Sequence, residues 1–232
     1  MKRVFCLVLS LMLFVGMGLS VLAEAPPKRI ALTFDDGPHA VYTAEILSIL
    51  KEYGIKATFF VVGQNAEEFP SLVKQAAEEG HEIGNHTYSH PKLKEQNAES
   101  FSYELEKTKA VLESITGVSP ILFRPPEGFR EGVIKTVAKE QGYQMVLWSV
   151  DTEDWRGLSA DRIENAIMKD VKDGSIILCH DYVAGQSHTP EALRRVIPRL
   201  LEEGYEFVTV SELAALYDKE LTKSTIHYHF RP

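Results

Sequence analysis

The chain has 232 residues, 44% of them hydrophobic and 25% charged, which is an ordinary globular composition and enough for one domain of catalytic size. Its formal net charge is −8 and it contains no basic run, so we expect no binding to nucleic acid. Internal repeats, low-complexity tracts and Pro/Gly/Ser-rich linkers are absent from the sequence, which favours a single domain, and we expect a monomer.

The first segment of the chain is apolar. Two basic residues precede a nearly unbroken apolar run at 4–22, and Ala23 and Ala25 form an A-x-A cleavage pattern. This arrangement predicts a secretory signal peptide over residues 1–25, and an exported protein that is extracellular or associated with the cell wall. An uncleaved membrane anchor formed by residues 4–22 is the alternative, because the run approaches the length that spans a bilayer.

After the leader, short apolar segments alternate with segments of helical periodicity. Strands are expected at Ile30–Phe34, Ala57–Val62, Glu82–Ile83, Ile121–Phe123, Gln144–Trp148, Ser175–Leu178 and Glu206–Val208. Helices are expected at Tyr42–Tyr53, Ala66–Glu79, Ala98–Thr116, Gly132–Gln141, Ala160–Asp170, Pro190–Glu203 and Ser211–Tyr217.

Regular alternation of strands and helices implies βα units and a mainly parallel sheet. We therefore predict an α/β fold, with a single distorted (β/α)7-type barrel over residues 28–217. A doubly wound open sheet is the alternative. Residues 218–232 form a polar C-terminal tail without a predicted element.

In parallel βα architectures, reactive groups lie just beyond the carboxyl ends of the strands. Polar residues follow five of the expected strands at this position. They are Asp35 and Asp36; His86 and His90; Arg124; Asp151, Asp154 and Trp155; and His180. Such a concentration of polar groups at one rim of the sheet predicts a catalytic site.

A divalent metal site is one reading of these residues. His86 and His90 are four apart, which on a helical turn would place both imidazoles on one face. One aspartate from the pair Asp35-Asp36 would complete three protein ligands and leave a position for water. A cation would also offset the repulsion between these adjacent carboxylates, although a simple turn at Asp-Gly-Pro is the alternative. Non-haem iron oxygenases use a similar ligand set, but the α/β pattern does not favour them.

Several segments together resemble a known family. TFDDG, HTYSH, RPPEG, DTEDW and IILCH, in this order and with the strand KATFFVVG, are similar to the motifs of the NodB-homology polysaccharide deacetylases, carbohydrate esterase family four. The resemblance runs from about Ile30 to Leu216. It implies a distorted (β/α) barrel and the metal-dependent removal of N- or O-acetyl groups from polysaccharides.

The resemblance also implies roles for individual residues. The residues similar to catalytic groups are the base Asp35, its partner Arg124, the general acid His180 and Asp154, which orients the acid. The residues similar to metal ligands are Asp36, His86 and His90. The residues expected to bind substrate are Pro126, Glu127, Trp155 and Leu178. We expect one divalent ion, Zn²⁺, with Co²⁺, Ni²⁺ or Mn²⁺ as alternatives.

Amide hydrolysis has physical requirements that these residues suit. It needs an activated water, a site for the oxyanion and a proton for the departing nitrogen. Bound Zn²⁺ lowers the pKa of its water to about 7, and a positioned acid or base contributes roughly 10² to 10⁴ in rate. Arg124 would hold Asp35 ionised, and His180 can be protonated near neutral pH.

The expected function is a secreted deacetylase acting on N-acetylglucosamine-type residues of peptidoglycan or chitin-like glycans. An O-acetyl esterase acting on xylan-like polysaccharide would need the same site, and a non-catalytic carbohydrate-binding relative is a further alternative. One departure from the family pattern bears on the substrate: Glu127 stands where an aromatic residue is usual. If that position acts through its backbone N–H, catalysis tolerates the change, whereas a lost stacking ring would alter substrate preference.

Overall fold

The computed structural model describes residues 27–217 and 226–227, so the predicted signal peptide at 1–25 lies outside the described residues. The described strands are β1 (Lys28–Asp35), β2 (Thr58–Val61), β3 (Glu82–Asn85), β4 (Leu122–Phe123), β5 (Gln144–Val146), β6 (Val150–Asp151), β7 (Ile176–His180), β8 (Tyr205–Phe207) and β9 (Ile226–His227). The described helices are α1 (Tyr42–Tyr53), α2 (Gly63–Glu68), α3 (Pro70–Glu78), α4 (Ala98–Thr116), α5 (Ile134–Glu140), α6 (Ala160–Asp170), α7 (Thr189–Glu202) and α8 (Val210–Leu216).

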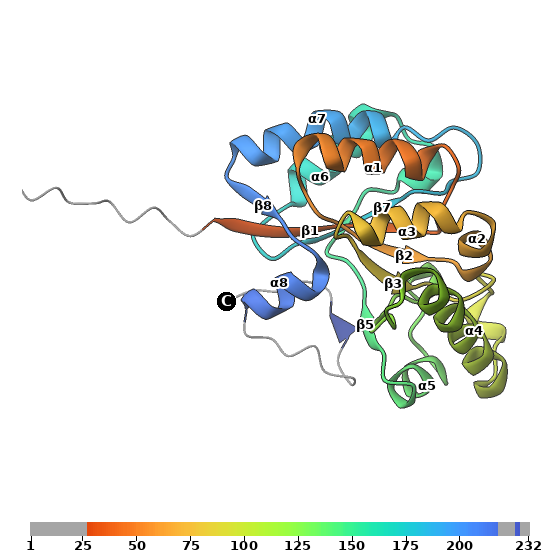
Figure 1. Cartoon of the computed structure of the whole chain (residues 1–232). Coiled ribbons are helices and arrows are strands. Elements are labelled where there is room, and N and C mark those ends of the chain that lie inside the picture. Colours follow the sequence, from red (N-terminus) through yellow and green to blue (C-terminus); the bar gives the residue numbers. More distant parts are fainter. Residues whose placement is uncertain (1–26, 218–225, 228–232) are drawn as a thin grey trace, which may run out of the picture.

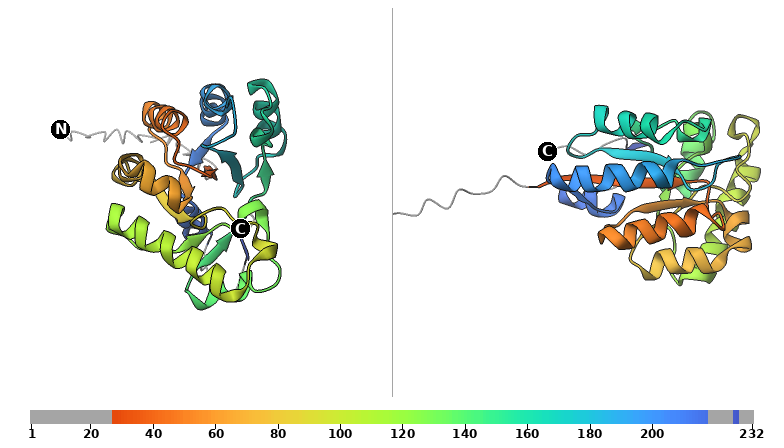
Figure 2. Two further views of the ribbon diagram at one scale, coloured as in Figure 1. Left: turned by 90° about the vertical axis from the view of Figure 1, so that its right-hand side faces the viewer. Right: turned by 90° about the horizontal axis from the view of Figure 1, so that it is seen from above.

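The strands form one curled sheet with the order β6-β7-β1-β2-β3-β4-β5-β9, and β8 pairs with the beginning of β1. Each strand pair in the described part of the chain is parallel. The helices other than α8 lie around the outside of the curl, and all the strand ends that carry the predicted polar residues point the same way (Figures 1 and 2). The predicted α/β fold with a distorted barrel is confirmed, because the order from β1 to β5 follows the chain as in a βα barrel.

Apolar side chains fill the fold on both faces of the sheet. On the outer face, strand residues such as Leu32 and Phe34 pack against α1 and α7. Inside the curl, α8 closes the amino-terminal end of the sheet, where Val210 and Leu213 belong to one buried cluster with Phe60 (Figure 1). These two clusters fix the strands, so the loops at the carboxyl ends begin from rigid positions.

Several predicted bounds shift by one or two residues, and three features differ more clearly from the sequence prediction. The helix expected at 66–79 is divided into α2 and α3, because Pro70 has no N–H to donate and disfavours a helical conformation at Phe69, whose φ is −125°. The two-residue strand β6 was not expected. In the predicted tail, Ile226 and His227 form β9 beside β5.

None of the helices in the described part of the chain combines the length and the apolar character needed to cross a membrane.

Candidate active site

Asp35 is the last residue of β1 and is only 3% exposed. Its Oδ1 accepts a hydrogen bond from Arg124 Nη1 at 2.8 Å, and its Oδ2 lies 3.8 Å from His86 Nε2. Asp35 is also the register partner of His180 on the neighbouring strand β7. The predicted base and the predicted acid therefore stand opposite each other at the same edge of the sheet.

Arg124 follows β4 and is fully buried, so it does not form a surface ion pair. Besides Asp35, its guanidinium donates to Thr33 Oγ1 at 2.7 Å and to the carbonyls of Val146 at 3.2 Å and Leu147 at 3.0 Å. Its Cζ lies 4.1 Å from the centre of the Phe60 ring. This number of contacts leaves the guanidinium little freedom, and so fixes the Asp35 carboxylate that it holds.

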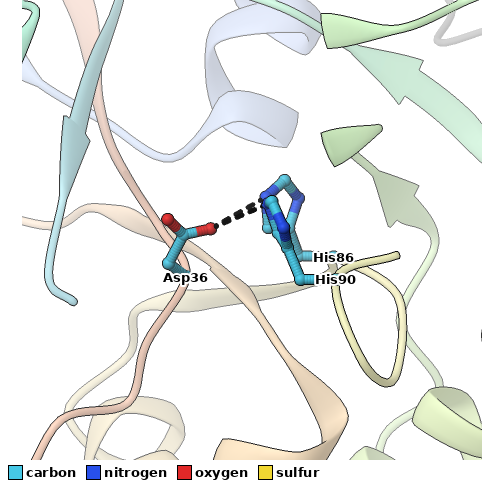
Figure 3. Close-up of side chains that lie close together, drawn as sticks. All are labelled: Asp36, His86 and His90. Atoms are coloured by element: carbon cyan, nitrogen blue, oxygen red, sulfur yellow. Dashed lines mark ion pairs between the residues drawn. The ribbon is translucent and has the colours of Figure 1, made fainter. Parts of the chain in front are cut away.

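Asp36, His86 and His90 converge from two loops (Figure 3). Asp36 Oδ1 lies 3.2 Å from His86 Nε2 and 3.3 Å from His90 Nε2. One ligand atom from each residue falls within 4.8 Å of the others, and no further group of this kind occurs among the described residues. The three residues could therefore hold a single metal ion.

The two histidines do not lie on a helix, so the helical interpretation of their spacing is wrong. Residues 86–90 form a loop in which Thr87 and His90 have φ values of 67° and 50°. Residues other than glycine rarely adopt this left-handed conformation, and it is costly for a β-branched residue such as Thr87. The loop brings the imidazoles together, with ring centres 5.1 Å apart.

The polar atoms of this group fit a cation. The Nδ1–H of His86 donates to the Arg124 carbonyl at 2.6 Å, which leaves a lone pair on Nε2 facing Asp36. Asp36 Oδ1 is buried and accepts no hydrogen bond. Burial raises the pKa of Asp36, but the facing histidines, His86 first, outweigh burial and lower it overall. A cation bound between His86 Nε2 and Asp36 Oδ1 would contact both atoms, and these donor types suit a divalent metal.

His180 ends β7 and is held by Asp154. Asp154 Oδ1 lies 2.7 Å from His180 Nδ1, while its Oδ2 accepts from the His180 backbone N–H at 2.8 Å and from Thr189 Oγ1 at 2.7 Å. Burial alone would lower the pKa of His180, but the bond to Asp154 and the charges of Asp35 and Asp36 raise it to about 9. The imidazole is therefore protonated at neutral pH, and Nε2–H is the proton it can release.

A titration tests this arrangement. In the metal-free protein we expect the His180 imidazole to titrate near pH 9, because the ordinary pKa of about 6.5 is raised by Asp154. Asp154→Asn removes the charge that outweighs burial, so the pKa of His180 should fall below that of the wild type. Long-range ¹H–¹⁵N NMR, with His180→Gln to assign the signal, measures both values. An unshifted wild-type pKa would contradict the proposed pairing.

The residues predicted to bind substrate lie at the same rim but differ in exposure. Pro126 is buried, whereas Glu127 is exposed with a φ of 55° in the short 3₁₀ turn at 126–128. Trp155 is 56% exposed in the turn that contains Asp154. Leu178 is buried in β7, two residues before His180 and hence on the same face of the sheet.

Three residues near these groups were not identified from the sequence. Thr189 holds Asp154, as described above. Glu104 on α4 accepts hydrogen bonds from the backbone of the loop that carries the histidines. Asp181, which follows His180, accepts from the Gly37 N–H at 3.0 Å and from Thr43 Oγ1 at 2.6 Å. Gly37 leaves the room that Asp181 occupies, because a Cβ at that position would lie 2.1 Å from Asp181 Oδ2.

Asp181, directly after β7, therefore holds the loop that precedes α1 through these two hydrogen bonds. Burial raises the pKa of Asp181 to about 7. In the sequence, only the position of Asp181 directly after a predicted catalytic residue could have drawn attention to it. Thr189 and Glu104 stand in helices with no such signal.

Comparisons with known proteins identify the family of the chain. The sequence model of a family described as polysaccharide deacetylase matches residues 23–146. A peptidoglycan-N-acetylglucosamine deacetylase of Bacillus cereus is 45% identical over 187 residues, which cover 80% of this chain and 68% of that protein. A chitooligosaccharide deacetylase of Azorhizobium caulinodans is 36% identical over 204 residues, covering 81% of this chain and 97% of that protein.

A solved structure is also similar. The family 4 acetyl xylan esterase from Clostridium thermocellum, in complex with a cobalt ion, matches with a TM-score of 0.83 and 34% identity, covering 88% of this chain and 100% of that chain. The family match spans more than half of the sequence, and the relatives match over most of it. The chain therefore belongs to the polysaccharide deacetylases of the NodB-homology type, carbohydrate esterase family four.

Proposed function

We propose that this protein is an exported, metal-dependent deacetylase that hydrolyses the N-acetyl group of N-acetylglucosamine-type residues in peptidoglycan or chitin-like glycans. One observation carries the proposal: three functional units meet at one edge of the sheet. They are the group Asp36, His86 and His90, the ion pair of Asp35 with Arg124, and the pair of His180 with Asp154. A protein that only bound carbohydrate would have no need of all three.

Asp36, His86 and His90 would hold the metal ion. Two imidazole nitrogens and one carboxylate oxygen form a donor set that Zn²⁺ accepts in catalytic sites, and Zn²⁺ is the ion we propose, with Co²⁺, Ni²⁺ or Mn²⁺ as alternatives. A divalent ion here would polarise the acetyl carbonyl and lower the pKa of water at the site. The similar acetyl xylan esterase structure is a complex with a cobalt ion, which supports a divalent metal at this site.

Asp35 would act as the base. It is buried beside the metal ligands, and its Oδ1 is occupied by Arg124 while Oδ2 faces His86. Because Arg124 fixes this carboxylate through Oδ1, Oδ2 would be free to take the proton of a water that attacks the acetyl carbon. His180 would then donate its Nε2 proton to the departing nitrogen, since Asp154 occupies Nδ1 and raises the pKa of the ring.

Exposed aromatic side chains support a sugar substrate. The sheet places β6, β7 and β1 side by side; Trp155 lies in the turn after β6, His180 ends β7 and Tyr182 follows it by two residues. Trp155 is 56% exposed and Tyr182 is 40% exposed. Tyr182 meets the His39 ring edge-on, with ring centres 5.2 Å apart, which limits its movement. Exposed rings near a catalytic group offer faces on which a sugar can pack.

Acetate release tests the proposed function. The purified protein, stripped by chelator and reloaded with Zn²⁺ or Co²⁺, should release acetate from N-acetylglucosamine oligomers or from peptidoglycan only when the metal is present. His86→Ala should lose metal and activity together, because it removes one of the three ligands. Release of acetate from acetylated xylan alone would contradict the proposal and show that the protein is an O-acetyl esterase. Metal binding without release from any of the three substrates would favour the carbohydrate-binding alternative.

A further inference from the structure

The loop at 86–90 carries two of the three proposed metal ligands, but it has no regular hydrogen-bonding pattern of its own. Thr87 and His90 in this loop adopt left-handed backbone conformations, with φ values of 67° and 50°. Such conformations persist only where surrounding contacts hold them. The position of the His90 imidazole therefore depends on groups outside the loop.

Glu104, on α4, supplies the contacts on one side of the loop. Its Oε2 accepts hydrogen bonds from the backbone N–H groups of Tyr88 and Ser89, both at 2.8 Å. Its Oε1 accepts from Ser89 Oγ, also at 2.8 Å. All three bonds fall on the two residues directly before His90. Hydrogen bonds to an ionised carboxylate are stronger than those between neutral groups, so three of them hold this segment firmly.

The first turn of α2 holds the same segment from the other side. The N–H groups of Gly63 and Gln64 donate to the carbonyls of Thr87 at 3.0 Å and Tyr88 at 2.9 Å. Gly63 also leaves room for the loop, because a Cβ there would lie 2.6 Å from the Tyr88 ring. The carbonyls are thus fixed by α2 and the N–H groups by Glu104. Removing Glu104 would leave two N–H groups without their partner and free one side of the loop.

We propose that Glu104 is a positioning residue for metal binding, which acts through the backbone of Tyr88 and Ser89 to hold His90 in its ligand geometry. The inference rests on the metal site of the proposed function. No contact joins the Glu104 carboxylate to either histidine ring, so its effect passes through the loop. Outer residues that orient metal ligands typically contribute about 10- to 100-fold to metal affinity.

The contacts predict which substitutions preserve this role. In Glu104→Gln, the amide oxygen can accept from both N–H groups and the amide nitrogen can donate to Ser89 Oγ, so the hydrogen-bonding pattern survives without the charge. Glu104→Met has a similar volume but no acceptor. Comparing the two separates hydrogen bonding from packing and from charge. Glu113, on the same helix, pairs only with Lys109 at 3.9 Å among the contacts described and provides a matched control.

Two measurements test the proposal. The first is Zn²⁺ affinity, determined by competition with a chromophoric chelator, and the second is the visible absorption spectrum of the Co²⁺ form. We expect Glu104→Met to bind Zn²⁺ about 10- to 100-fold more weakly and to change the Co²⁺ spectrum, while Glu104→Gln and Glu113→Met stay close to wild type. The melting temperature of each metal-free variant shows whether the fold is retained, and Glu104→Ala replaces Glu104→Met if that variant does not fold.

Each outcome decides the question. Wild-type affinity and spectrum in the folded Glu104→Met variant would overturn the positioning role while leaving the metal site intact. Equal weakening in Glu104→Gln and Glu104→Met would assign the effect to charge, and would overturn positioning through hydrogen bonds. If the wild-type protein itself binds no metal, the proposed metal site is wrong, and this role is refuted with it.

Discussion

Asp35→Asn is expected to lower kcat by about 10² to 10⁴ while metal content stays at the wild-type level. In the wild type, Arg124 Nη1 donates to Asp35 Oδ1 at 2.8 Å. Asparagine keeps the shape of the side chain and an oxygen that can accept this hydrogen bond. It cannot accept a proton from water, so the base is lost and the metal ligands stay in place. Initial rates of acetate release, measured with metal analysis of the same sample, check both parts.

Asp36→Asn provides the contrast to this variant. Asp36 Oδ1 faces both histidines, so its substitution should reduce metal content as well as activity. If Asp35→Asn turned over substrate at the wild-type rate, Asp35 would not be the base. If it lost metal as Asp36→Asn does, the division of roles between the two adjacent aspartates would be wrong.

Arg124→Met should lower the free energy of unfolding by about 3–5 kcal/mol, because it leaves the buried Asp35 carboxylate without its ion-pair partner. Both partners are almost fully buried, with side-chain exposures of 0% for Arg124 and 5% for Asp35. The exchange also removes the donors to Thr33 Oγ1 and to two backbone carbonyls. Urea unfolding of the metal-free protein measures the change.

An exposed pair on the same protein provides the control. Arg194 Nη1 and Glu52 Oε2 lie 2.9 Å apart, close to the 2.8 Å of the buried pair, but their side chains are 44% and 56% exposed. Arg194→Met should therefore cost less than about 1 kcal/mol. Adding Asp35→Asn to Arg124→Met should recover part of the lost stability, since the unpaired charge is then removed. Equal effects of Arg124→Met and Arg194→Met would show that the buried pair has no special energetic role.

The sequence predicted the elements whose signals are local. The bounds of α1 and α4 agree with the prediction, because their apolar periodicity ends at Gly54 and Gly117, which take left-handed φ values of 65° and 73°. The parallel sheet followed from the alternation of elements. The strands β6 and β9 were not predicted, because each has two residues and is defined by its neighbour in the sheet and not by any pattern of its own.

The site was predicted to the extent that its residues stand at the ends of strands. Asp35, Arg124 and His180 could be grouped because parallel strands bring their carboxyl ends to one edge. The loop conformation at 86–90 could not be predicted, since the spacing of two histidines fits a helical turn equally well. Glu104 supports that loop by accepting from backbone N–H groups. Almost every residue type has such a group, so the contact leaves no pattern in the sequence of the loop.

The packing of Gly37 against Asp181 limits how this enzyme can be redesigned. A side chain at 37 would occupy the space of the Asp181 carboxylate, and a smaller residue at 181 would leave the Gly37 N–H and Thr43 without their acceptor. Single substitutions at either position are therefore unfavourable. Substitutions that the fold tolerates should change residues 37 and 181 together. A library that varies the loop after His180 to alter substrate choice should begin at Tyr182 and keep Asp181 constant.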